Sequence, residues 1–456
     1  VVIAAKEGEK TYTATHLLNF VQDRINVSGT VNAIRNNRIG GNLYFISSNG
    51  MIVNSGGAIN AGALTVMAPQ YSHISKAFSA LDDGATNTAT EILKGMIKGD
   101  IPLNPSGSIV INGTVRTGVE SRFMAANIVV GKDLEVDGEG AAQFNADGTL
   151  KVSGDHNARI VNGVNFSSIV NTTGLEGCEY ELPANFDTDT TSQYRLNLQK
   201  EVVDGDDVYY LLDAPQGIRS DGTVTLQAKL GVEKTSIETV TGSASIKTNI
   251  EIGKDAVIDS VGSVNIAATS DASPSGVDFS LTLAFLDVIA NVNVDGTITA
   301  GHNVDINANA TSTSMHFGPG DFTTGIITKI LTSGFDAFNP AYYAGYAFSA
   351  FKENLTPFLM GNAITFIKAT AKADVKVGAT ANVTAKDDVN VQGMSTAVAM
   401  GMRSVTPNKT YDVLGGQQPY ENINFAMANL DSVCNVDIEG NLTAEEGTVQ
   451  AMAISA

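Results

Sequence analysis

Residues 298–306, with the sequence ITAGHNVDI, carry the pattern that decides the fold. Apolar and polar residues alternate on both sides of a short polar turn, and alternation with a period of two is typical of a half-buried strand. The pattern returns as VTAKDDVNV at 383–391 and as LTAEEGTV at 442–449, with looser copies at 258–266 and 59–66. The chain therefore repeats one unit made of two short strands joined by a turn.

Such a unit cannot bury its apolar side chains alone, but a stack of copies can. We therefore predict an all-β protein, a right-handed parallel β-helix (β-solenoid), with Val304, Ile306, Val389 and Val391 pointing inward. With roughly 20 residues per coil and about a quarter of the chain in insertions, about 17 coils are expected. A tandem of β-sandwiches would need strands of about six or more residues. The repeated segments are mostly shorter, so the solenoid is favoured.

The composition agrees with a strand-rich, exported protein. Of 456 residues, 45 are Gly and only 17% are charged, whereas a helical protein would be richer in Leu, Glu, Lys and Arg. The net charge of −20 and the lack of Lys/Arg clusters argue against a nucleic-acid partner. Two cysteines, Cys178 and Cys434, provide no metal site and suit a protein that avoids disulfides during export. No apolar run reaches membrane-spanning length.

Four stretches interrupt the repeat and predict short helical and hairpin excursions from the solenoid. The stretch near 72–98 shows helical spacing, and the second stretch has two alternating runs around an acidic turn at 204–207. The stretch at 320–367 is rich in aromatic residues, and the stretch at 403–428 contains Pro and Gly. We divide the chain into an N-terminal β-helix over 1–175 with a helical insertion near 72–98, a hairpin-bearing β excursion over 176–245, and a continuing β-helix over 246–456 that contains an aromatic, partly helical insertion at 320–367 and a loop at 403–428.

The aromatic insertion is the candidate interface. Ten aromatic residues within 48 positions cannot all face water without forming an apolar patch, and such patches mark contact surfaces. Either the segment packs as helices on the side of the rod, or it contacts a neighbouring protein copy. The residues that show helical spacing, and that we take as the candidate interface, are Phe335, Phe338, Tyr342, Tyr343, Tyr346 and Phe351.

A more specific resemblance begins at residues 17–70 and extends over roughly the first 175 residues. The runs LLNFV, INVSGTVNAIRNN, IGGNLYFI, SSNGM and GAINAGAL follow one another there. This order resembles the secretion-domain core of filamentous-haemagglutinin-type large exoproteins, most closely the leukotoxin-like filamentous adhesins of anaerobic Gram-negative bacteria. Where the wider family carries an Asn-Pro-Asn-Gly motif, this chain has Ser47-Ser48-Asn49-Gly50. Asn-Gly is a strong turn dipeptide, so the motif is expected at a coil corner, as a plain turn or as a secretion signal.

The resemblance implies export across the outer membrane with the help of a transporter there, and a final location in the medium or on the bacterial cell surface. Its implied partners are a receptor or glycan on a host or bacterial surface, together with other copies of the chain.

The sequence offers no pattern that argues for catalysis. The densest acidic residues, at 187–189 and 204–207, lack the spacing of a calcium-binding loop, and the five histidines are scattered. Gly318-Pro319-Gly320 is not followed by the Gly-Lys-Ser/Thr of a phosphate-binding loop. We therefore expect no enzyme activity, no catalytic residue, no cofactor and no metal.

Three functions stay open. The first is an adhesin rod that mediates attachment, aggregation or filament and matrix formation. The second is a polysaccharide-degrading β-helix enzyme, and the third is a secretion and folding module without binding activity of its own. The missing acid–base cluster favours the first over the second.

Overall fold

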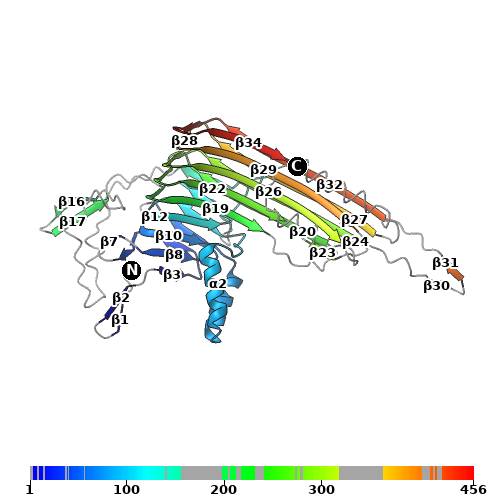
Figure 1. Ribbon diagram of the computed structural model, residues 1–456, viewed down its shortest axis with the longest axis horizontal. Helices are drawn as coiled ribbons and strands as arrows, with labels where there is room; N and C mark the ends of the chain where they lie inside the picture. The colour runs from blue at the N-terminus through cyan, green and yellow to red at the C-terminus, as the bar shows by residue number, and fades with distance from the viewer. Residues whose placement is uncertain are drawn as a thin grey trace.

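The computed structural model describes residues 4–155, 198–211, 217–231, 241–277, 281–317, 363–402, 411–418 and 424–456, apart from short gaps within these ranges. Its strands wind into stacked coils, from the N-terminal strands at one end of the stack to the C-terminal strands at the other (Figure 1). Within the two large sheets all pairs of neighbouring strands run parallel. The predicted parallel β-helix is therefore confirmed.

Two large sheets form the walls of the solenoid. Sheet 1 contains, in spatial order, β4 (Ile25–Val27), β9 (Gly50–Val53), β11 (Ser108–Ile111), β13 (Asn127–Val130), β20 (Thr241–Ile252), β24 (Leu281–Val294), β27 (Ala363–Val377) and β32 (Asn424–Ile438).

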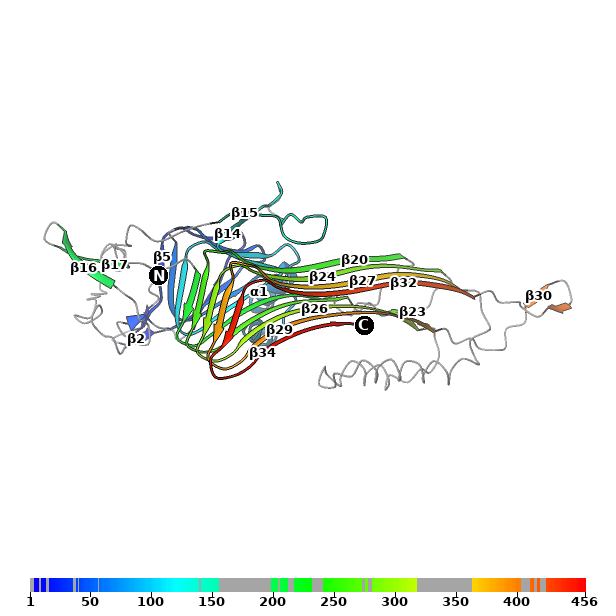
Figure 2. The same ribbon diagram turned by 90° about the horizontal axis from the view of Figure 1, so that it is seen from above.

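Sheet 2 contains sixteen strands, because most coils contribute a short strand at the corner and a longer one that returns beside sheet 1 (Figure 2). Its strands are β3 (His16–Phe20), β5 (Thr30–Asn32), β8 (Asn42–Ile46), β10 (Ala58–Met67), β12 (Thr114–Ala125), β18 (Gly217–Ser220), β19 (Thr223–Gly231), β21 (Val257–Ser260), β22 (Val264–Ala272), β23 (Ser275–Val277), β25 (Thr297–Ala300), β26 (Val304–Phe317), β28 (Asn382–Ala385), β29 (Val389–Met402), β33 (Asn441–Ala444) and β34 (Val449–Ser455).

The coils are fewer than the repeat predicts, and the later ones are longer. Sheet 1 has eight strands among the described residues, one for each coil, rather than about 17. In the later coils Val264 pairs with Val304, which lies 40 positions further along the chain. The repeated motif is only the centre of each coil, because β26 continues for 14 residues. Beyond Ile306 its inward positions are filled by Ala308 and Ala310, both at most 1% exposed, and alanine gives no strong apolar signal in a sequence.

The interior is a largely apolar stack with some inward Ser and Thr side chains. Val304, Ile306 and Val389 are 0% exposed and Val391 is 1% exposed, so the predicted inward positions are confirmed. Alternation puts their neighbours, such as Asp305, on the outer surface, where Asn390 Nδ2 donates to its carboxylate over 2.9 Å. Each coil thus buries its apolar face on the next, which is what one unit cannot do alone.

The helical excursion consists of two helices between β10 and β11, α1 (Tyr71–Asp82) and α2 (Thr86–Lys98). Met96 is 1% exposed within the core cluster, and Ile92 and Leu93 pack against it, so one helix face is anchored on the N-terminal coils. Gly99 ends α2 in the left-handed conformation (φ 80°). Neither helix of the described chain is long and apolar enough to span a membrane.

Antiparallel hairpins supply the remaining described excursions. The hairpin expected around the acidic turn at 204–207 is present as β16 (Leu198–Val203) and β17 (Asp206–Leu211). The expected loop at 403–428 is partly wrong, because β30 (Tyr411–Val413) pairs with β31 (Gly416–Gln418) and β32 begins at Asn424. The other pairs are β1 (Ala4–Glu7) with β2 (Lys10–Thr13), β6 (Ile34–Arg35) with β7 (Arg38–Ile39), and β14 (Lys132–Leu134) with β15 (Val152–Asp155).

The last part of the predicted aromatic insertion is strand rather than helix. Residues 363–367 belong to β27, which pairs with β24 over its whole length. Residues 318–362 lie outside the described residues, and with them the six residues of the candidate interface.

Candidate functional site

The Ser47-Ser48-Asn49-Gly50 motif forms a corner between the two sheets. β8 ends at Ile46 and β9 begins at Gly50, so the motif occupies the turn between them. The backbone N–H of Gly50 donates to the carbonyl of Ser47 over 2.9 Å, and Gly50 has a φ of 82°. Glycine is the residue that adopts this conformation without strain. The turn therefore depends on Gly50 for a local, physical reason.

Side chains from neighbouring segments tie this corner down. Ser47 Oγ donates to the carbonyl of Asp23 over 2.7 Å, and Arg24 Nε donates to the carbonyl of Asn49 over 3.1 Å. On the other side, Asn104 Nδ2 donates to the carbonyl of Ser48 over 2.8 Å. The corner thus joins the segment before it to the connection that follows the helices. This geometry accounts for a structural role, while the secretion role stays a prediction.

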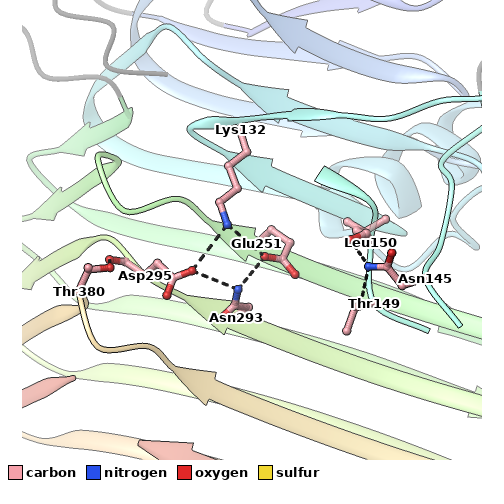
Figure 3. Close-up of polar contacts among 8 residues, drawn as sticks. All are labelled: Lys132, Asn145, Thr149, Leu150, Glu251, Asn293, Asp295 and Thr380. Atoms are coloured by element: carbon pink, nitrogen blue, oxygen red, sulfur yellow. Dashed lines mark hydrogen bonds and ion pairs between the residues drawn. The ribbon is translucent and has the colours of Figure 1, made fainter. Parts of the chain in front are cut away.

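A charged cluster on the outer face of sheet 1 was not found from the sequence (Figure 3). Lys132, the first residue of β14, places its Nζ 3.9 Å from Glu251 Oε2 and 3.6 Å from Asp295 Oδ2. Asn293 Nδ2 completes the cluster by donating to Glu251 Oε2 over 2.9 Å and to Asp295 Oδ2 over 3.3 Å. One lysine therefore bridges the ends of β20 and β24, which belong to consecutive coils.

Burial controls the protonation of this cluster. The side chain of Glu251 is 6% exposed, and desolvation raises its pKa to about 7, against the lowering effects of Asn293 and Lys132. The lysine at 3.9 Å is too distant for a good hydrogen bond, so it offsets only part of the desolvation. Glu251 consequently exchanges its proton near neutral pH, which is the property a general acid or base needs.

An amide ladder beside the cluster binds the 132–155 excursion to the sheet. Asn249 Nδ2 donates to Asn127 Oδ1 over 3.3 Å, and Asn291 Nδ2 donates to Asn249 Oδ1 over 2.8 Å. Asn291 Nδ2 also lies 3.3 Å from the carbonyl of Gly148 in the excursion. Leu150, 2% exposed, packs there in a small apolar cluster with residues of sheet 1. The ion pairs of Lys132 therefore also help to hold this excursion against sheet 1.

The chemistry open to the Lys132 cluster is limited by its own lysine. The ammonium group lies between two carboxylates, where a cation would otherwise be held. Among the described residues no group of three or more His, Cys, Asp or Glu side chains could hold a metal ion. Lys132 and Glu251 are 119 positions apart, so no local motif could have revealed their contact. The only signal was the spacing of Glu251 and Asn293, which are register partners on neighbouring strands.

Comparison of the chain with protein-family models, with curated proteins and with solved structures returns no match.

Proposed function

We propose that this chain is a structural adhesin, a rod at the cell surface or in the medium that mediates attachment, aggregation or filament and matrix formation. The observation that carries the proposal is the repetition of outward polar positions along the stack. Asn265, Asp305, Asn390 and Gln450 are consecutive register partners on four strands of sheet 2. A surface on which similar groups recur once per coil suits recognition of an extended or repetitive partner.

The resemblance of residues 17–70 to filamentous-haemagglutinin-type exoproteins supports the same function. It also supports export through an outer-membrane transporter, which would recognise the corner at Ser47–Gly50. The receptor class proposed is a protein or glycan on a host or bacterial surface, and self-association is a second mode of contact.

A polysaccharide-degrading enzyme is the second candidate, and one observation favours it. Glu251, with its pKa raised to about 7, lies beside Asp295, and paired carboxylates perform glycoside chemistry. Against it stand the burial of Glu251 and the ion pair that already engages both carboxylates. The adhesin is therefore the stronger proposal.

One experiment separates these functions. Beads coated with the full 456-residue chain are mixed with bacterial and host cells, while the soluble chain is applied to a glycan array and its own aggregation is followed by light scattering. Beads coated with heat-denatured chain are the control. We expect attachment or aggregation by the folded chain only. Release of sugar fragments from acidic polysaccharides, lost in Glu251→Gln, together with no attachment, would establish the enzyme instead.

A further inference from the structure

Arg116 is a buried arginine on the outer face of the solenoid. It is the third residue of β12 and lies between Val115 and Thr117, which both point inward and are buried. Alternation puts Arg116 on the opposite face, and yet only 7% of its surface is exposed. Arginine is seldom buried to this degree unless it is paired. Nevertheless, its Nε and Nη1 atoms have no hydrogen-bond partner within the part of the chain that the structure describes.

The neighbour of Arg116 on the next coil adds a second positive charge. Arg219 in β18 is its direct register partner, so two guanidinium groups occupy adjacent strands about 4.8 Å apart. Desolvation, and secondly the charge of Arg219, lower the pKa of Arg116 to about 10. Asp259, one coil further, contacts Arg219 Nε over 3.4 Å, and among the described residues no carboxylate forms an ion pair with Arg116. The row of three residues therefore carries one uncompensated positive charge.

A second orphan donor lies on the same face. Thr114 precedes Arg116 by two residues in β12 and is 3% exposed, and its buried hydroxyl finds no hydrogen-bond partner among the described residues. Buried polar groups are normally satisfied, and a buried charge without a partner is among the most unfavourable arrangements in a protein. One anion between these groups would satisfy the hydroxyl, both nitrogen atoms and the excess charge together.

We propose that Arg116, Arg219 and Thr114 form a binding site for a single carboxylate group. The planar guanidinium matches a carboxylate, which accepts two parallel hydrogen bonds. A singly charged anion balances the net charge of Arg116, Arg219 and Asp259, whereas a doubly charged phosphate or sulfate would exceed it. Arg219, with 38% of its side chain exposed, marks the open end of the site. The carboxylate comes from a small organic acid or from an acidic sugar unit.

This inference does not depend on the proposed adhesin function, because it concerns one site and can be tested by binding alone. The full chain is titrated with sodium acetate, sodium glucuronate and sodium phosphate at constant ionic strength set with sodium chloride. Binding is measured by calorimetry and by the shift of the thermal unfolding midpoint, which a ligand of the folded state raises. We expect both carboxylates to bind at one site and phosphate to bind more weakly.

Two variants assign the site. Arg116→Met should lower carboxylate affinity about tenfold to hundredfold, as expected for a lost charge-assisted contact. Thr114→Val should lower it about two- to tenfold, because only a neutral hydrogen bond is lost. Lys229→Met removes the same charge from an exposed position on β19 and should leave the affinity unchanged. Glucuronate binding without acetate binding would identify an acidic sugar as the source, and equal binding would identify the carboxylate group itself.

Stability without ligand provides an independent measurement. In chloride alone Arg116→Met should be at least as stable as the parent chain, because it removes a buried charge that has no partner. Equal carboxylate affinity in Arg116→Met and the parent would overturn the proposal. It would also fail if phosphate bound more tightly than both carboxylates, or if Arg116→Met were clearly less stable than Lys229→Met in chloride alone.

Discussion

The α-carbon of Gly50 faces the backbone carbonyl of Ser108 on the next coil, so closely that a β-carbon on Gly50 would lie 1.9 Å from that oxygen. The two residues are register partners of β9 and β11. Two restrictions therefore meet at Gly50, since its φ of 82° disfavours other residues and its neighbouring strand leaves no room for a side chain. Position 50 therefore accepts only a residue without a side chain, so that the two strands can pair at the normal spacing.

Replacing Gly50 by alanine should destabilise the chain by roughly 2–5 kcal/mol, the sum of backbone strain and overpacking. Gly84, between the helices, is the matched control because its φ is 73° and a β-carbon there would meet nothing within 4 Å. Gly84→Ala should cost only the strain, about 1–2 kcal/mol. Chemical denaturation of both variants measures the difference. Equal losses would show that the contact with Ser108 relaxes without cost.

Export can separate the structural role of the corner from recognition by a transporter. The side chain of Asn49 is exposed, and its backbone carbonyl accepts a hydrogen bond from Arg24. Asn49→Ala should therefore fold like the parent, whereas the double change of Asn49 and Gly50 to Val should impair folding and export together. Secretion and circular dichroism are compared for both. Normal folding of Asn49→Ala with reduced export would assign a recognition role. Normal export of the double Val variant would show that export does not depend on the motif.

Val389 tests the apolar stack, because it is 0% exposed between its register partners Val304 and Val449. Val389→Asp buries a charge without a partner and should cost roughly 3–5 kcal/mol. Thr384→Asp adds the same charge on the outer face, where its register partners Thr299 and Thr443 carry none. Denaturant midpoints should fall strongly for the first variant and little for the second. A stable Val389→Asp protein would contradict the inward orientation.

The stability of the chain should decrease between about pH 4.5 and about pH 7 because of Glu251. Its pKa is about 7 when folded and 4.5 as a free side chain, so the folded state binds more protons within this interval. The stabilisation is therefore fully present below the lower value and is lost as the pH rises through the higher one, by a few kcal/mol in all.

Glu251→Gln should abolish this component of the pH dependence, since the amide stays neutral. Unfolding free energies at about pH 5 and about pH 8 are compared with those of Glu439→Gln, which changes an exposed carboxylate. Other carboxylates, such as Asp388, have a lowered pKa and act in the opposite direction, so the difference between variants is the informative quantity. If both variants follow the parent, the burial of Glu251 does not govern its titration.

The sequence predicts the parts of this fold that depend on local pattern. Alternating Val304 and Ile306 reveal the inward face, and the dipeptide Asn49-Gly50 reveals a corner. Coil length could not be predicted, since alanine and serine at positions such as Ala308 and Ser312 fill the inward row without a hydrophobic signal. The Lys132 cluster could not be predicted either, because it exists only after an excursion folds back on strands more than a hundred positions away.

Unequal lengths of chain between register partners give the stack an uneven response to force. Val449 pairs with Val389, which pairs with Val304, which pairs with Val264, at separations of 60, 85 and 40 residues. Pulling on Ala456 would detach the coils one after another from this end. At about 3.5 Å per residue the released lengths would be about 210, 300 and 140 Å. The coil between Val304 and Val389 would therefore release the greatest length. The molecule would lengthen under load while the coils nearer the N-terminus stay folded.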